Sequence, residues 1–265
     1  MRPPVALTIA GTDSSGGAGV LADAATFRAH GVWPTAAVTA VTAQDTVGVH
    51  AVQAVGADVV AAQIDAVRRD IRPDAAKTGM LGGAEVVEVV ARAWRGDPAP
   101  LVIDPVLRAT TGAALLDAAA VGVLLERLLP LAALVTPNLA EAAALTGLPV
   151  EDRPGMVAAG QALRGMGAAA VLVTGGHLAG DMVADCLVTA DGVRWFTGRR
   201  LATPHTHGTG CVLSAAVAAR LARGDALGDA VVGARRFVRR AIRDGGPLGQ
   251  GAGPVAPGAP SWRAW

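Results

Sequence analysis

The chain has 265 residues, of which 52% are hydrophobic and 17% are charged, and its formal net charge is +1. This composition predicts a globular protein and gives no electrostatic reason to expect a nucleic acid or an anionic membrane surface as a partner. The uncharged stretches are interrupted by Gly, Thr, Pro or His, which argues against a membrane-spanning helix of about 20 apolar residues.

Two cysteines, Cys186 and Cys211, are too few for a disulfide scaffold and indicate a reducing compartment. The first residues show no basic region followed by an apolar run and a small-residue cleavage site, so no secretory signal is visible. We therefore expect a cytoplasmic protein.

Short Val, Ile, Leu and Ala runs alternate with longer Ala-rich amphipathic stretches, a pattern typical of βα units around a mostly parallel, buried sheet. The short runs predict strands over Val5–Ala10, Ala36–Thr42, Ala75–Thr78, Leu101–Asp104, Ala133–Thr136 and Ala170–Thr174. The longer stretches predict helices near Gly17–His30, Asp58–Asp70, Ala84–Trp94, Ala118–Leu129, Leu139–Thr146, Pro154–Met166, Gly210–Arg223 and Leu227–Arg243. The Asp191-Gly192 pair inside Ala184–Phe196 is a strong turn signal and predicts a hairpin.

No linker of distinct composition divides the chain, so one domain is expected over residues 1–253. Residues 254–265 are rich in Gly and Pro, which oppose regular structure, and are predicted to form a flexible tail. In an open parallel sheet, ligands bind at the carboxyl ends of the strands. The loops that follow the predicted strands are therefore the candidate site.

The strongest local signal is the stretch T-H-G-T-G-C, residues 206–211, which precedes an apolar helix. Glycines at a helix start let backbone N–H groups turn toward an anion, and the helix dipole favours negative charge there, which suits a phosphoryl group. The same potential would lower the pKa of the Cys211 thiol, making it a candidate base or nucleophile. A glycine turn before a buried helix, with an inert cysteine, is the alternative that these residues leave open.

The glycine-rich loop after the first strand, residues 11–19, matches neither the dinucleotide fingerprint nor the P-loop, so NAD enzymes and P-loop NTPases are disfavoured. It predicts a loop of small residues over a small ligand, with Asp23 facing it, although an Asp early in a helix is also a common surface residue. The carboxamide of Gln44 could recognise a ring nitrogen beside an exocyclic amine. Asn138 and Glu141 could organise a hydrated magnesium ion together with Asp104, or could form only a capping box.

Seven stretches together resemble one family, and they occur in that family's order along the chain. They are ALTIAGTDSSGGAG (6–19), TAVTAQDTVGV (39–49), AAKTGMLG (75–82), VIDPV (102–106), LVTPNLAEA (134–142), VLVTGGHL (171–178) and THGTGC (206–211). The chain thus resembles, over nearly its whole length, the hydroxymethylpyrimidine and phosphomethylpyrimidine kinases of thiamine biosynthesis, within the ribokinase-like superfamily.

The resemblance implies an α/β fold, a three-layer α/β/α sandwich, with ATP and Mg²⁺ as co-substrates and a homodimer. It implies phosphorylation of 4-amino-5-hydroxymethyl-2-methylpyrimidine and then of its monophosphate to the diphosphate. The catalytic residues it implies are Gly208, Thr209 and Gly210 as the anion hole and Cys211 as the base. The substrate contacts are Gly11, Asp23, Gln44, Met80, Val106 and Leu107. The ATP contacts are Asn138, Thr174, Gly176, Thr209 and Gly210, and the expected magnesium carboxylates are Asp104 and Glu141.

Three positions that commonly carry positive charge in this family are neutral or weakly basic here. The usual M-V-A-K-S-G is replaced by residues 107–112, K-G-G-H begins with Thr174, and Pro204 and His205 precede T-H-G-T-G-C. One explanation is compositional, with Arg108 or another arginine reaching the phosphates. The alternatives are a pyridoxal or pyridoxine kinase, or a catalytically weak pyrimidine- or nucleotide-binding protein. Gln44 with Asp23 favours the aminopyrimidine.

Overall fold

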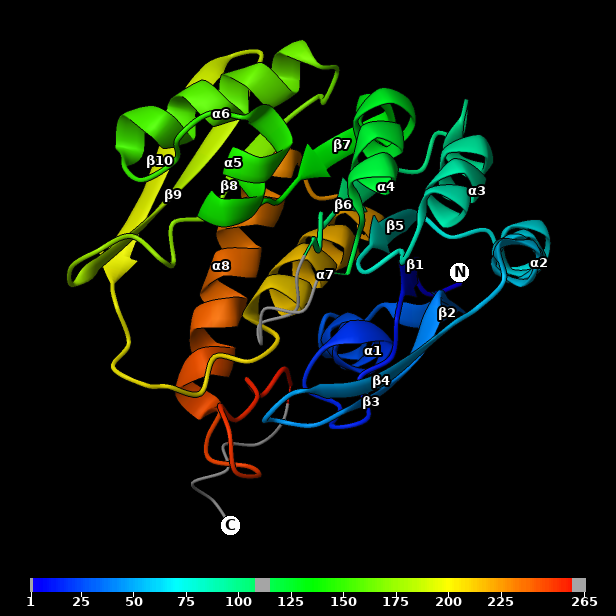
Figure 1. Ribbon diagram of the computed structural model, residues 1–265, viewed down its shortest axis with the longest axis horizontal. Coiled ribbons are helices and arrows are strands. Elements are labelled where there is room, and N and C mark those ends of the chain that lie inside the picture. Colours follow the sequence, from blue (N-terminus) through cyan, green and yellow to red (C-terminus); the bar gives the residue numbers. More distant parts are fainter. Residues whose placement is uncertain (1, 108–114, 259–265) are drawn as a thin grey trace.

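The computed structural model describes residues 2–107 and 115–258, and it is built around one eight-stranded sheet in the order β10-β9-β8-β7-β6-β5-β1-β2 (Figure 1). Neighbouring strands from β8 to β2 are parallel, whereas β9 and β10 join β8 as an antiparallel hairpin. The strands are β1 (Val5–Ala10), β2 (Trp33–Val38), β5 (Ala75–Thr78), β6 (Leu101–Ile103), β7 (Ala132–Val135), β8 (Val171–Val173), β9 (Met182–Thr189) and β10 (Gly192–Arg199).

Helices cover both faces of the sheet, because the buried strands alternate apolar side chains between two cores. One core contains Ala6, Ala75 and Val102 and is covered by α1 (Gly19–Ala29), α7 (Thr209–Ala222) and α8 (Leu227–Asp244). The other contains Leu7, Ala76 and Ile103. It is covered by α2 (Ala57–Asp70), α3 (Ala84–Trp94), α4 (Ala118–Val123), α5 (Leu139–Thr146) and α6 (Arg153–Gly165). The predicted three-layer α/β/α sandwich with a mostly parallel sheet is confirmed.

A second, two-stranded antiparallel sheet pairs β3 (Ala40–Gln44) with β4 (Val49–Ala54) and extends beside β1 and α1 (Figure 1). The single strand predicted over Ala36–Thr42 is wrong, since the chain leaves the main sheet at Thr39. The backbone N–H of Thr39 still donates to the carbonyl of Ala10, and the residues after it pair with β4 instead. The sequence did not predict β4 because its residues are mostly exposed and form no apolar run.

The segment after Asp117 also differs from prediction. Instead of one α-helix over Ala118–Leu129, α4 ends at Val123 and is followed by a π-helical turn (Leu124–Leu128) and a 3₁₀ turn (Leu129–Leu131). Pro130 lies in the 3₁₀ turn and has no N–H to continue an α-helix. The other predicted helices are observed with ends shifted by at most a few residues.

The C-terminal segment is held against the site, which differs from the flexible tail predicted from residue 254. Val255 and Ala256 are buried, and the N–H of Val255 donates to the carbonyl of His207 at 3.0 Å. The N–H of Ala256 donates to the carbonyl of Ala241 on α8, also at 3.0 Å. The rest of the predicted tail from residue 259 lies outside the described residues. Within the described part of the chain, no helix is long and apolar enough to cross a membrane.

Candidate active site

Two glycine-containing segments meet backbone to backbone at the carboxyl edge of the sheet. They are the loop after β1, residues 11–19, and the turn before α7, residues 206–208. Gly208 has φ +81°, and a Cβ there would lie 1.8 Å from the carbonyl oxygen of Gly17. Gly208 is also the N-cap of α7, and no side chain caps that helix. The first amides of α7 are therefore left without a side-chain acceptor, as an anion-binding turn requires.

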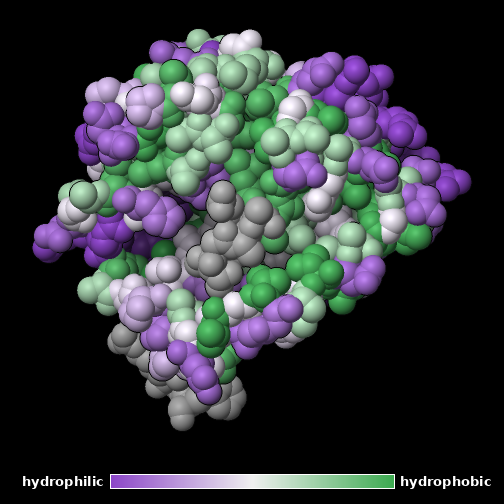
Figure 2. All heavy atoms as spheres, viewed as in Figure 1, coloured by the Kyte–Doolittle hydropathy of each residue, from purple (hydrophilic) through white to green (hydrophobic). Residues whose placement is uncertain are grey.

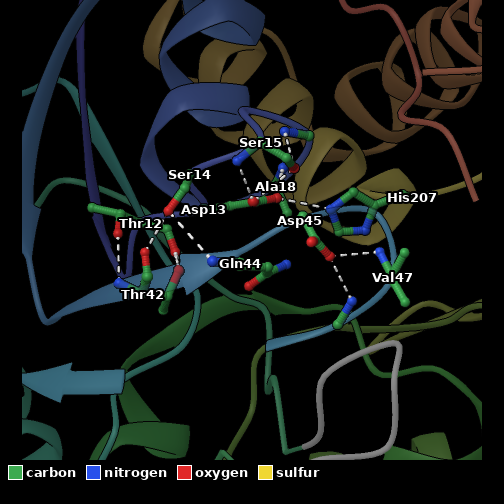
Figure 3. Close-up of polar contacts among 12 residues, drawn as sticks. Thr12, Asp13, Ser14, Ser15, Ala18, Thr42, Gln44, Asp45, Val47 and His207 are labelled. Atoms are coloured by element: carbon green, nitrogen blue, oxygen red, sulfur yellow. Dashed lines mark hydrogen bonds and ion pairs between the residues drawn. The ribbon is translucent and has the colours of Figure 1, made fainter. Parts of the chain in front are cut away.

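A buried carboxylate ties these two segments together (Figure 3). Asp13 accepts hydrogen bonds from the backbone and hydroxyl of Ser15, from the N–H of Ala18 and from Nε2 of His207, at distances between 2.7 and 2.9 Å. Burial opposes ionisation of Asp13, but these hydrogen bonds outweigh it and hold its pKa below the ordinary 3.8. Asp13 thus acts as an ionised clamp between the glycine-rich loop and the α7 turn.

The same loop is bonded to β3, which carries Gln44 (Figure 3). The hydroxyl of Thr42 donates to the carbonyl of Thr12 at 2.8 Å, and the N–H of Thr42 donates back to Thr12 Oγ1 at 2.9 Å. Ser14 Oγ donates to the carbonyl of Thr42 at 2.5 Å. Gln44 is only partly buried, and its carboxamide forms no hydrogen bond with any other described residue. This amide is available for a ligand.

Some of the expected pocket residues lie together. A Cβ on Gly11 would be 3.2 Å from the sulfur of Met80, so the backbone of Gly11 and the Met80 side chain share one small space. Leu107 is buried and Val106 half-buried at the end of the loop after β6. Their contact with a substrate stays a prediction.

The alternative that Asp23 is a surface residue is wrong. Its side chain is fully buried, with the Nζ of Lys77 at 2.9 and 3.2 Å from its two oxygens and Thr8 Oγ1 donating at 2.6 Å. Both of its oxygens are therefore engaged beneath the site rather than open to a ligand. A pattern of residues along one helix could not show this partner, which lies 54 positions away on β5.

The expected electrostatics of Cys211 is wrong. Burial, together with the charges of Asp104 and Asp23, raises the pKa of the thiol to about 12 and outweighs the lowering by the positive charge of Lys77. The lowering of the thiol pKa by the helix terminus is thus outweighed by burial and by two acids that are distant from Cys211 in the sequence. Cys211 is a protonated thiol at neutral pH.

Asp104 and Glu141 form a pair of crowded carboxylates. Burial and the charge of Asp104 raise the pKa of Glu141 to about 8, and burial also raises the pKa of Asp104. The capping box that the sequence left open is present: the Asn138 side chain accepts from the Glu141 N–H at 3.0 Å, and Glu141 Oε2 accepts from the Asn138 N–H at 2.9 Å. A Cβ on Gly210 would lie 3.9 Å from Asp104 Oδ2, which places Asp104 beside the glycine turn.

The loop after β8 lies next to Asn138, because Thr174 forms a parallel bridge with it. Arg200, just after β10, holds this loop by donating to the carbonyl oxygens of Gly176, Leu178 and Gly180. Arg108, the arginine named above as a candidate to reach the phosphates, lies outside the described residues. Sequence reasoning missed Arg200, and it missed Lys77 although that is the only lysine in the chain.

The mostly parallel sheet between two helical layers, with a glycine turn that opens a helix at its carboxyl edge, defines a ribokinase-like α/β fold that solved kinases share. Residues 13–256 match the family model described as phosphomethylpyrimidine kinase, and the chain belongs to this family of kinases.

Relatives and solved structures agree with this assignment. A hydroxymethylpyrimidine/phosphomethylpyrimidine kinase of Synechococcus elongatus is 46% identical over 264 residues, covering 96% of this chain and 97% of its own. The crystal structure of an ADP complex of Bacillus subtilis pyridoxal kinase has a TM-score of 0.91 at 36% identity and covers 96% of this chain and 97% of that one. A crystal structure of phosphomethylpyrimidine kinase from Clostridium difficile has a TM-score of 0.80 at 36% identity. The match covers 90% of this chain and 99% of that one.

The clamp at Asp13 predicts a pH-dependent contribution to stability. Because its folded pKa lies below 3.8, the contribution is complete above that pH and is lost as the pH falls through the folded value. Asp13→Asn should lower the free energy of unfolding at pH 7 by about 1–3 kcal/mol. The difference from wild type should shrink below pH 3.8. Urea unfolding at pH 7 and at a pH below 3.8 measures the two free energies of unfolding. Asp191→Asn, in the exposed hairpin turn, is the control. A loss that is independent of pH would contradict an ionised clamp.

Proposed function

We propose that this protein is an ATP-dependent kinase that phosphorylates 4-amino-5-hydroxymethyl-2-methylpyrimidine and then its monophosphate. One observation carries the proposal: the uncapped glycine turn at the start of α7 lies beside the paired carboxylates Asp104 and Glu141. Amide donors that can hold a phosphoryl group are thereby placed next to acids that can hold a cation. Family membership and the curated relatives, which bear the name of this activity, support the choice of substrate.

In each phosphoryl transfer, an acceptor oxygen forms a bond to the γ-phosphorus while the bond from that phosphorus to the β,γ-bridging oxygen breaks, and ADP leaves. The acceptor in the first step is the hydroxymethyl oxygen, which loses its proton. The amides of Gly208, Thr209 and Gly210 would donate to the phosphoryl oxygens, where negative charge spreads in the transition state. Since Cys211 carries its proton at neutral pH, we propose that it acts as base only through its minor thiolate form.

The residues present fit a magnesium ion. Mg²⁺ takes oxygen ligands, few of them carboxylates, and keeps several waters. Asp104 supplies a buried carboxylate and Glu141 a partly buried one, and burial raises the pKa of both. When bound there with the nucleotide, the ion would offset the charge of the phosphate oxygens. Asp104 is held for this by Ser214, whose hydroxyl donates to its Oδ2 at 3.0 Å.

The identity of the substrate ring distinguishes the proposed pyrimidine kinase from a pyridoxal kinase. The second activity is considered because the solved structures with TM-scores of 0.91 include pyridoxal kinases. With Asp23 buried, the argument for the aminopyrimidine rests on the free carboxamide of Gln44, which can pair with a ring nitrogen and its neighbouring amine. Pyridoxal offers no such amine. The carboxamide therefore favours the pyrimidine.

Mass spectrometry of products from Mg²⁺-ATP with the hydroxymethylpyrimidine should show the monophosphate and then the diphosphate. Gln44→Leu should lower kcat/KM for the pyrimidine by about a hundredfold, since a buried polar group of the ligand is left unpaired, and should change kcat/KM for pyridoxal much less. Specificity constants on both alcohols measure this. A wild-type preference for pyridoxal would replace the proposal with the second activity, and binding without product would indicate a binding protein.

The nucleotide is proposed to lie along the loop after β8, with Asn138, Thr174 and Gly176 as contacts. This chain lacks the basic residue common at position 174, and we propose that Arg200 compensates by fixing the loop through its three carbonyl groups. An ordered loop costs less entropy when the nucleotide binds.

Arg200→Ala should therefore raise the KM for ATP about tenfold while changing kcat less than threefold, an effect of about 1.4 kcal/mol on binding. Arg199→Ala is the matched control, since this neighbouring arginine is also exposed and its side chain forms no hydrogen bond with another described residue, while its carbonyl accepts from Arg239. Initial rates over a range of ATP concentrations separate the two parameters. Equal KM values for ATP in the two variants would contradict the proposed role of Arg200.

A homodimer is proposed to form through the β3–β4 sheet. Val41, Val47 and Val52 of this hairpin are each about half exposed, and Figure 2 shows apolar side chains mixed with polar ones over the lower region where Figure 1 places β3 and β4. Val41→Lys with Val52→Lys should convert a dimer into a monomer by light scattering. Val193→Lys, on the exposed face of β10, should leave the mass unchanged, and a monomeric wild type would refute the proposal.

A further inference from the structure

Lys77 is the only lysine of the chain and is completely buried. On β5 it points to the same face as Ala75, toward the layer of α1 and α7, and it is paired in register with Thr8 of β1. Its Nζ lies 2.9 and 3.2 Å from the oxygens of Asp23, which is equally buried. The three form one compact group under the carboxyl edge of the sheet.

Stability alone is a poor explanation for this pair. Burying two charges costs several kcal/mol per ion, and apolar residues of similar volume often replace a buried pair without loss. The fold nevertheless reserves space for the ammonium, since a Cβ on Gly79 would lie 2.9 Å from Nζ. Gly79 directly follows β5, so the ammonium lies just beneath the backbone of the site's edge.

Asp104 follows β6, the strand next to β5, and its N–H donates to the carbonyl of Thr78, the neighbour of Lys77, at 3.0 Å. Cys211 follows Gly210, where a Cβ would lie 3.9 Å from Asp104 Oδ2. Asp23 on α1, Asp104 after β6 and Cys211 on α7 therefore place three acidic groups around Lys77. Burial would lower the pKa of Lys77, but these three groups outweigh it and raise the pKa well above 10.5. Asp23 takes two of the three ammonium N–H groups. The remaining two acids, Asp104 and Cys211, lie at the proposed reacting centre.

We propose that Lys77 is a positioning residue for phosphoryl transfer, whose buried ammonium supplies the positive charge that faces Asp104 and Cys211 beneath the first turn of α7. The proposal deepens the proposed function and rests on it. Lys77 does not touch the substrate. It acts through the two groups above it, in a site where fixed charges need no reorganisation when the phosphoryl group moves. Asp23 is then its counter-ion.

The test uses the double variant Asp23→Asn with Lys77→Met, which keeps the packing but removes both charges. Its unfolding midpoint should stay close to that of wild type, while kcat falls at least tenfold and both KM values change less than threefold. Arg68→Met with Asp97→Asn is the matched control, because this partly buried pair is carried by α2 and the loop after α3. It should leave kcat unchanged. A double variant at positions 23 and 77 with kcat within threefold of wild type overturns the proposal.

A second readout needs no turnover. The rate at which iodoacetamide alkylates Cys211 at one fixed pH, followed by mass spectrometry with buried Cys186 as internal reference, reports the charge around the thiol. The double variant should react at least threefold more slowly. Asp23→Asn alone, which keeps the ammonium, should react faster than wild type because Asp23 raises the pKa of the thiol. A purely structural role would shift both variants in the same direction, and that result overturns the proposal.

The two hypotheses fail differently. If wild-type protein phosphorylates neither alcohol, the proposed function is wrong, and the alkylation rates then test only whether the ammonium of Lys77 sets the charge around Cys211. If wild type makes product and the double variant matches it, only the role of Lys77 is wrong.

Discussion

The glycine-rich loop after β1 and the turn before α7 touch through their backbones, and the rest of the site depends on this approach. Gly208 has no room for a side chain, since a Cβ would lie 1.8 Å from the oxygen of Gly17. Two segments nearly 200 positions apart are held there by the bond from His207 to Asp13. Because the turn makes a backbone contact, the first amides of α7 have no side-chain acceptor among the described residues, at the edge where Asp104 follows β6.

That arrangement concentrates acid at the carboxyl edge before any ligand binds. Asp104, Glu141 and Cys211 all have raised pKa values, for which burial is the largest cause. Each would ionise more readily if a cation bound beside it. We infer that the binding of a cation and the ionisation of these groups are coupled.

Local signals in the sequence predicted local features well. Continuous apolar runs located most strands of the main sheet, and the spacing of Asn138 and Glu141 predicted the capping box. Asp23 and Cys211 were misjudged because their surroundings come from elsewhere in the chain. Lys77, 54 positions from Asp23, cannot be placed by helix position or dipole direction. The β3–β4 sheet was missed for a related reason, since its exposed residues leave no hydrophobic pattern.

Geometry explains why this chain has an arginine at position 200 and a lysine at position 77. Arginine carries five N–H groups in a planar fork and suits a place with several acceptors, as at Arg200, which meets three carbonyl groups near solvent. At Lys77, among the residues that the structure describes, only the two oxygens of Asp23 are within hydrogen-bonding distance, and a Cβ at Gly79 would lie 2.9 Å from Nζ. A guanidinium there would bury unpaired donors at a cost of about 1–3 kcal/mol each. A chain that uses arginine at 22 positions therefore still requires lysine at this one.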